Sequence, residues 1–219
     1  MQPKQKVIAI DGPSASGKGT VAARVAQALG WAYLDSGALY RLTALYAQTL
    51  DTEWHNEAAV AALATTLPAT FSGQTILLNG RDVSAEIRTE AIGMGASAIA
   101  SLPAVRTALL QRQRDFLTEK GLVADGRDMG SVVFPDACLK IFLTATAETR
   151  ARRRTAQIGL PCHGIEFERI LSDIEARDEA DRRRKTAPLQ QLPDAHLLDT
   201  TQLTIEESVK KVLDWYEKI

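Results

Sequence analysis

The sequence predicts an α/β fold in which a parallel sheet is covered by helices on both faces. Short, β-branched apolar runs alternate along the chain with longer segments in which apolar residues recur at helical spacing. The first apolar run leads directly into a glycine-rich loop and a helical pattern. The 219 residues suit one sizeable domain, with room for a small insert.

The first elements follow from local patterns. Residues 7–10 (VIAI) are apolar and end near Gly12, which is typical of a buried parallel strand. Apolar residues recur at helical spacing between 21 and 29, and Gly30 ends that helix. Residues 31–37 (WAYLDSG) predict a second strand and a turn, and residues 41–67 predict an Ala/Leu-rich helix.

A small antiparallel meander is expected next, within residues 70–83. The pairs Ser72-Gly73 and Asn79-Gly80 flank a short apolar segment and predict two tight turns. An antiparallel sheet inside an α/β chain indicates an inserted subdomain.

The second half continues the alternation. Residues 103–119 predict a helix, and Thr204 with Glu207 predicts a capping box that begins the last helix. Three further strands are expected at residues 122–124, 140–143 and 196–198.

Composition narrows the classes of function. The formal net charge of −1 argues against a general nucleic-acid binder, which is usually basic. The chain has two cysteines, Cys138 and Cys162, without a C-x-x-C pair, so free thiols in a reducing compartment are expected. The three histidines are scattered along the sequence, which argues against a zinc site built from histidines. With no signal-peptide core or apolar span in the sequence, we expect a cytoplasmic monomer that binds no membrane.

The glycine-rich loop carries the strongest chemical signal. The usual phosphate-binding pattern is G-x-x-x-x-G-K-[ST], and Gly12, Gly17 and Lys18 fit it. Gly19 stands where the hydroxyl residue is expected, and Thr20 follows one position late. Strand, loop, lysine and helix occur in the order that lets backbone N–H groups surround a phosphate, which favours this reading over a plain glycine turn.

Two segments are expected to face this loop, because the carboxyl ends of parallel strands line one crevice. They are Asp35-Ser36-Gly37-x-x-Tyr40-Arg41 and residues 124–130 (ADGRDMG). Taken alone, Asp125 could equally be a turn residue.

Two arginine-rich helix faces are also candidates. Arg150, Arg153 and Arg154 share a face by i, i+3, i+4 spacing. Arg177, Asp181 and Arg184 share another by i, i+4, i+7 spacing. As isolated basic runs, both would more simply be solvated faces.

The G-K-G-T form of the loop resembles that of nucleoside monophosphate kinases, in which the threonine supports Mg²⁺ or the nucleotide phosphates. The whole chain resembles the bacterial cytidylate kinase family. Eight segments carry the resemblance: IDGPSASGKGT, LDSGALYR, DVSAEIRTE, LPAVRTALLQRQR, ADGRDMGSVVFPDA, KIFLTA, RDEADRRRKTAPL and LLDTT.

The resemblance implies a single domain over residues 1–219, with a three-layer phosphate-loop (P-loop) core. It also implies an insert that binds the nucleoside monophosphate, about residues 62–102, and a short helical lid, about residues 150–168. Its activity would be transfer of the γ-phosphoryl group of ATP to CMP or dCMP with Mg²⁺. The catalytic residues would be Lys18, Arg127, Asp128 and Arg184.

The resemblance also assigns the binding residues. Ser36, Arg41, Arg127 and Arg184 would contact the CMP phosphate; Ser97, Arg106 and Asp128 would recognise cytosine; Arg177 and Asp181 would hold the sugar hydroxyls. Arg150, Arg153 and Arg154 would be lid residues that close over ATP. The metal would have no direct protein ligand, with Thr20 reaching it through water. ATP would contact Gly12, Pro13, Ser14, Ala15, Ser16, Gly17, Lys18, Gly19 and Thr20.

Two other functions fit part of the pattern. A kinase for a hydroxyl acceptor would need a base, and Asp35 is the plausible residue near the right strand. A nucleotide-dependent switch would bind without transfer; for a GTPase it would carry an [NT]-K-x-D segment, which the sequence lacks.

Overall fold

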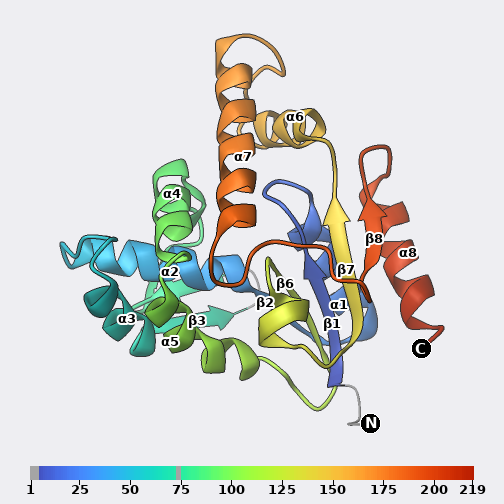
Figure 1. Cartoon of the computed structure of the whole chain (residues 1–219), viewed down its shortest axis with the longest axis horizontal. Coiled ribbons are helices and arrows are strands. Elements are labelled where there is room, and N and C mark those ends of the chain that lie inside the picture. The colour runs from blue at the N-terminus through green and yellow to red at the C-terminus, as the bar shows by residue number, and fades with distance from the viewer. Residues whose placement is uncertain (1–4, 73–74) are drawn as a thin grey trace. The chain divides into compact units, whose positions relative to one another are not determined.

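The computed structural model describes residues 5–72 and 75–219 and divides them into two compact units. Among the described residues, unit 1 runs up to Leu34 and from Phe116 to Ile219, and unit 2 lies between Asp35 and Asp115. Figure 1 shows the helices and strands along the chain.

Unit 1 is built on a five-stranded sheet in the order β2-β6-β1-β7-β8. β1 pairs in parallel with β6 and β7, and β7 pairs in parallel with β8, which confirms the predicted sheet. The strands are β1 (Gln5–Asp11), β2 (Ala32–Asp35), β6 (Leu122–Gly126), β7 (Ala137–Thr144) and β8 (His196–Asp199).

Helices flank this sheet. α1 (Lys18–Leu29) and α8 (Ile205–Tyr216) contact each other and share one core with the strands. Gly30 is left-handed after α1, and both bonds of the Thr204/Glu207 capping box are present, as predicted. Fully buried side chains of this core include Ile8, Ile10, Val25, Leu143 and Val212.

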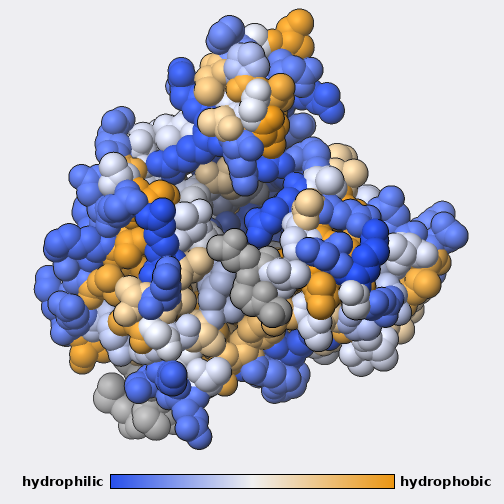
Figure 2. All heavy atoms as spheres, turned by 180° about the vertical axis from the view of Figure 1, so that it is seen from behind, coloured by the Kyte–Doolittle hydropathy of each residue, from blue (hydrophilic) through white to orange (hydrophobic). Residues whose placement is uncertain are grey.

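Two packed helices, α6 (Ala147–Gln157) and α7 (Ile165–Arg183), complete unit 1 (Figure 1). Their shared core is small: Ala151, Phe167 and Ile174. Where the chain passes from α6 to α7 it exposes apolar side chains, with Ile158 46% and Ile165 88% exposed. Figure 2 shows orange, apolar spheres among hydrophilic ones at the top of the view.

The described residues of unit 2 form four α-helices and an antiparallel sheet in the order β3-β4-β5. The Asn79-Gly80 turn is present, with both residues at positive φ; Gly73, part of the other expected turn, lies outside the described residues. The elements are α2 (Ser36–Thr49), α3 (Glu57–Thr65), β3 (Ala69–Ser72), β4 (Thr75–Leu78), β5 (Arg81–Asp82), the 3₁₀ turn η1 (Glu86–Arg88), α4 (Glu90–Ile99) and α5 (Pro103–Arg114).

Two helix predictions need correction. Residues 41–67 are not one helix: the chain leaves α2 at Leu50, Asp51 takes a φ of 50°, and the Asn56 side chain caps α3. The helix predicted over residues 103–119 ends at Arg114.

No single helix in the described part of the chain has the length and apolar composition to cross a membrane. α4 and α5 meet that test only when taken together, across a bend of 102°.

Candidate active site

The phosphate loop, residues 12–20, connects β1 to α1 in the predicted order. Gly17 precedes α1 with a φ of 91°, a conformation that side chains with a Cβ rarely adopt. Lys18 is the first residue of α1 and is buried, with its Nζ donating to the carbonyl of Pro13 at 3.3 Å. The lysine is thus folded back over its own loop, at a helix N-terminus that favours anions.

The structure gives a reason for the unusual Gly19. A Cβ at Gly19 would lie 2.9 Å from Asp125 Oδ2 and 3.4 Å from the Tyr33 hydroxyl oxygen. Asp125 is 4% exposed and lies in β6 opposite Ile10 of β1. A side chain at position 19 would therefore displace a buried carboxylate, and Asp125 is a sheet residue beside the phosphate loop rather than a turn residue.

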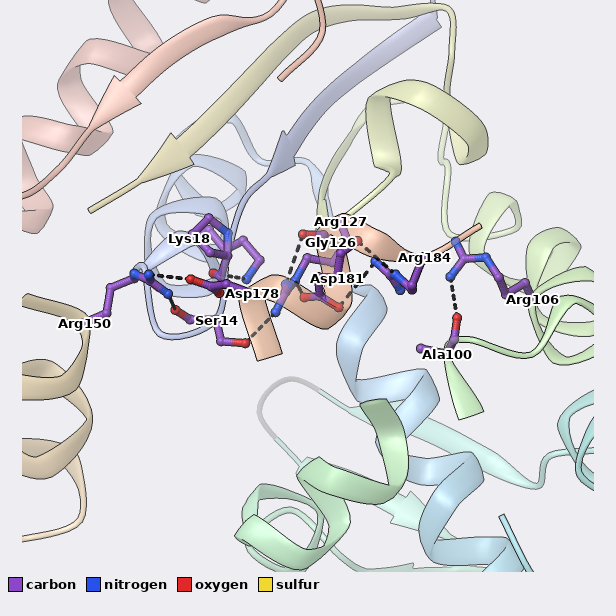
Figure 3. A network of polar contacts seen from close by, with 11 residues as sticks. Ser14, Lys18, Ala100, Arg106, Gly126, Arg127, Arg150, Asp178, Asp181 and Arg184 are labelled. Carbon is purple, nitrogen blue, oxygen red and sulfur yellow. Dashed lines mark hydrogen bonds and ion pairs between the residues drawn. The ribbon is translucent and has the colours of Figure 1, made fainter. Parts of the chain in front are cut away.

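Two arginines hold the backbone and the side chain of Ser14 in the phosphate loop. Arg127 Nη2 donates to the Ser14 hydroxyl at 3.0 Å, and Arg150 Nη1 donates to the Ser14 carbonyl at 3.1 Å. Each arginine also pairs with a carboxylate of α7 (Figure 3): Arg127 Nε lies 2.7 Å from Asp181 Oδ2, and Arg150 Nη2 lies 2.5 Å from Asp178 Oδ2.

The electrostatics of this cluster keep Asp181 ionised. Burial raises the pKa of Asp181, but the positive charges of Arg127 and Arg184 outweigh it, and the net pKa lies below the ordinary value. Arg184 Nη2 lies 3.5 Å from Asp181 Oδ1. The positive charge of Lys18 contributes to the same lowering of the Asp181 pKa.

The helix face predicted to carry Arg177, Asp181 and Arg184 is present only in part. α7 ends at Arg183, and Arg184 follows in an extended conformation, with φ of −55° and ψ of 133°. Arg184 therefore reaches Asp181 from beyond the helix end rather than from the next helical turn. Arg177 lies within α7 and is half-buried.

The expected lid arginines differ in their surroundings. Arg150 is buried, and its Nε donates to the Ala145 carbonyl at 3.0 Å. Arg153 Nη1 donates to the Ser16 carbonyl at 3.0 Å, and its Nη2 donates to the Thr200 carbonyl at 2.6 Å. Arg154 donates to Gln157 on the same helix. Two of the three thus bond to the phosphate loop itself.

Unit 2 holds four of the predicted substrate residues: Ser36, Arg41, Ser97 and Arg106. Ser36 is buried and donates to Gln113 Oε1 at 2.6 Å; Arg41 Nη1 donates to the Ile87 carbonyl at 2.8 Å.

Two of the three residues expected to recognise cytosine, Ser97 and Arg106, lie in unit 2, and the third, Asp128, is a buried residue of unit 1. Ser97 is half-buried on α4. Arg106 Nη1 donates to the Ala100 carbonyl at 3.0 Å (Figure 3), and its guanidinium lies 5.9 Å from the centre of the Tyr40 ring.

Several polar residues of the site were not singled out by sequence patterns: Asp11, Gln113 and Asp178. Asp11 Oδ1 accepts the Met129 N–H at 2.8 Å, and Oδ2 accepts the Gly130 N–H at 2.9 Å. Burial raises the pKa of Asp11 to about 6, against these two hydrogen bonds, which lower it. For Asp11, the one signal in the sequence was an acidic residue at the end of an apolar strand.

The hydroxyl groups of the phosphate loop are the oxygens of the site that bear on a metal bound to a nucleotide. No group of three or more His, Cys, Asp or Glu side chains that could hold a metal occurs within residues 5–72 and 75–219. In the loop, the buried Ser16 hydroxyl has no hydrogen-bond partner among the described residues, and the Thr20 residue is exposed. These oxygens suit phosphate and a hydrated cation.

Comparison with known proteins shows the family to which the chain belongs. A family model described as cytidylate kinase matches residues 8–218. A cytidylate kinase of Neisseria gonorrhoeae is 76% identical over 216 residues, covering 99% of both chains. One of Chromobacterium violaceum is 58% identical, covering 97% of this chain and 96% of the other. An uncharacterized protein of Eubacterium ventriosum shares the fold, with a TM-score of 0.54, 11% identity and coverage of 98% of this chain and 100% of that one. The chain therefore belongs to the cytidylate kinase family.

Proposed function

We propose that this chain, as an ATP-dependent kinase of the cytidylate kinase family, transfers the γ-phosphoryl group of ATP to CMP or dCMP. The observation that carries the proposal is that the Arg127 guanidinium donates hydrogen bonds both to Ser14 of the phosphate loop and to Asp181 of α7. It joins a loop suited to the ATP phosphates to Asp181, which is proposed to bind the sugar of the monophosphate, through an arginine that is itself proposed to bind the second phosphate.

The acceptor needs no general base. The second pKa of a phosphate monoester is about 6, so a nucleoside monophosphate is already an anionic nucleophile at neutral pH. Phosphoryl transfer then depends on alignment and on stabilisation of the spreading negative charge. Lys18, Arg127 and Arg184 supply positive charge for this purpose. Asp35, the candidate base for a hydroxyl acceptor, uses Oδ1 to cap α2 at the Ala38 N–H, 3.0 Å away.

The phosphate loop is proposed to bind ATP through residues 12–20. Its backbone N–H groups and Lys18 would hold the phosphates, with Mg²⁺ bridging them and Thr20 reaching the metal through water. Bound Mg²⁺ would neutralise charge that develops on the phosphate oxygens. The buried Ser16 hydroxyl offers a further donor in the same loop.

The nucleoside monophosphate is proposed to bind to the residues that the family resemblance assigns to its phosphate, its sugar and its base. Ser36, Arg41, Arg127 and Arg184 would bind its phosphate, and Arg177 with Asp181 would bind the sugar hydroxyls. Ser97, Arg106 and Asp128 would recognise cytosine, whose N4 amino group donates where uracil O4 accepts.

We also propose that the chain carries an insert that binds the monophosphate and a short helical lid. The insert, about residues 62–102, lies within the residues of unit 2. The lid, about residues 150–168, includes the exposed end of the α6–α7 pair, whose small core suits a segment that opens locally. Arg150, Arg153 and Arg154 would belong to it, the first two through their bonds to the phosphate loop. We also propose a monomer that works in the cytoplasm and binds neither membrane nor nucleic acid.

A panel of acceptors tests the function. Release of ADP is measured with CMP, dCMP, UMP and small hydroxyl compounds, and CMP and dCMP are expected to be the best substrates. Lys18→Ala serves as the control for the site, with turnover expected to fall about a hundredfold or more. A faster reaction with a hydroxyl compound, or normal turnover by folded Lys18→Ala, would reject the assignment.

Replacement of Asp128 tests the reading of the base. A carboxylate facing uracil O4 leaves two acceptors opposed, so wild type is expected to prefer CMP strongly over UMP. Asp128→Ala should narrow the ratio of the two kcat/KM values. Equal losses for CMP and UMP would show that Asp128 does not read the base.

A further inference from the structure

Asp11 ends β1 and stands directly before the first glycine of the phosphate loop. Its side chain is buried, and its two carboxylate oxygens accept separate backbone bonds, from Met129 N–H at 2.8 Å and from Gly130 N–H at 2.9 Å. The carboxylate therefore connects the strand that carries the phosphate loop to a distant segment of chain.

That segment begins with Arg127 and Asp128. Met129 and Gly130 open a single π-helical turn, η2 (Met129–Val133), whose wide geometry is often found at functional sites. Asp128 precedes it with φ of −148° and ψ of 24°, and the Asp128 carbonyl accepts the N–H groups of Val132 and Val133. The conformation of Asp128 is thus set by the turn that follows it.

The segment is fixed on both sides of the two site residues. Gly126 is held in the sheet, where it pairs with Asp11 of β1. Met129 and Gly130 are held by the Asp11 side chain. Arg127 and Asp128 lie between these supports, so their backbone has little freedom of its own.

Burial disfavours the charged form of the Asp11 carboxylate, and repulsion from Asp128 disfavours it further. Both effects raise the pKa of Asp11, whereas the two N–H donors and Arg127 lower it. Groups with strongly perturbed pKa values occur preferentially at functional sites, which supports a role beyond packing.

We infer that Asp11 is a positioning residue: it holds the backbone of Met129 and Gly130 and thereby directs Arg127 and Asp128 toward the monophosphate. The inference rests on the proposed roles of Arg127 and Asp128. A small displacement of groups that align a substrate can cost about a hundredfold in rate, so a support of this kind has a measurable effect.

The test compares Asp11→Ala and Asp11→Asn with Val212→Ala, a cavity variant in the core of unit 1. Binding of CMP alone and of ATP alone is measured by calorimetry on folded protein. Asp11→Ala should weaken CMP binding about tenfold or more and ATP binding less than about threefold. Asp11→Asn should fall in between, because its one carbonyl oxygen accepts one N–H while its amide group opposes the other. Val212→Ala should lower the melting temperature and leave both affinities unchanged.

A second arm shows whether Asp11 acts through the segment. With Arg127 already replaced by alanine, Asp11→Asn should cost less CMP affinity than it does in wild type, since coupled residues are not additive. If Asp11→Ala does not fold, Asp11→Asn decides the matter.

The failures are distinguishable. If wild type neither binds nor phosphorylates CMP, the proposed function fails. If wild type does both, but the Asp11 variants bind CMP as tightly as Val212→Ala, the positioning role is overturned. Equal losses of CMP and ATP affinity would also overturn it, because they would indicate a general effect on the phosphate loop.

Discussion

Two arginine–aspartate ion pairs lie one turn apart on α7 and differ in how far their side chains are exposed to solvent. Asp178 pairs with Arg150, and the two side chains are 5% and 6% exposed. Asp181 pairs with Arg127, and these side chains are 11% and 23% exposed. Both arginines also bond to Ser14, so the number of hydrogen bonds does not distinguish them.

The partners of the two arginines show the difference. Arg150 donates to two backbone carbonyls, of Ala145 and Ser14, which no ligand needs to replace. Arg127 also donates to one backbone carbonyl, of Gly126, but its other two partners are the side chains of Ser14 and Asp181, which are both proposed to contact substrates. An enclosed pair with backbone partners stabilises the loop, whereas a partly open pair with side-chain partners can exchange them for a phosphate.

The largest expected effect is on turnover by Arg127→Ala. Removing one cation that stabilises a transferring phosphoryl group typically costs about a hundredfold or more in kcat. Stability should change little, because Asp181 keeps Arg184 nearby. The measurement is steady-state kinetics together with thermal unfolding, and near-normal kcat would place Arg127 among the structural arginines.

Arg150→Ala should act mainly on stability. Removing one partner of an enclosed pair leaves the buried Asp178 charge uncompensated, which typically costs about 3–5 kcal/mol in the free energy of unfolding. Urea denaturation measures this loss. The kcat of the protein that remains folded should stay within about tenfold of wild type. An unchanged midpoint would contradict the enclosed character of this pair.

Asp181→Ala should weaken use of both monophosphates. Loss of a hydrogen bond to a charged group should cost about 1.5–3 kcal/mol in kcat/KM for CMP and for dCMP, since both carry the 3′-hydroxyl. The KM for ATP should be nearly unchanged. Because Asp181 is buried and pairs with Arg127, it is not part of a plain solvated helix face. Unchanged kcat/KM for both monophosphates would show that Asp181 supports the fold and does not bind the sugar.

The smallest effect is expected when both members of the enclosed pair are replaced together. Apolar residues of similar volume often substitute for a buried ion pair without loss, so Arg150→Met with Asp178→Leu should recover most of the stability that Arg150→Ala loses. Denaturation of the double variant against each single variant measures the recovery. A double variant as unstable as the worse single one would show that the carbonyls of Ala145 and Ser14 depend on Arg150.

Local patterns predicted the parts of the molecule that are locally determined. The phosphate loop, the Asn79-Gly80 turn and the Thr204 capping box each depend on residues a few positions apart, and all three are present. The break between α2 and α3 was missed because the segments on either side of it are both rich in alanine and leucine, although residues 51–56 (DTEWHN) contain neither residue. Packing also holds this break, with Trp54 Nε1 donating to the Ala44 carbonyl of α2 at 3.0 Å.

The supporting residues of the site could not be predicted from spacing. Asp11 meets Met129 across 118 residues, and Asp178 meets Arg150 across 28. Gly19 shows the same limit: the sequence revealed its departure from the usual pattern, and only the fold places Asp125 where a side chain would stand.

The most direct test of phosphoryl transfer is the stoichiometry of the products. Purified protein is incubated with ATP, Mg²⁺ and CMP, and ADP and CDP are separated and quantified by chromatography through one time course. We predict one CDP for each ADP, with almost no ADP when CMP is omitted. Release of ADP without CDP, at the same rate with and without CMP, would contradict the account.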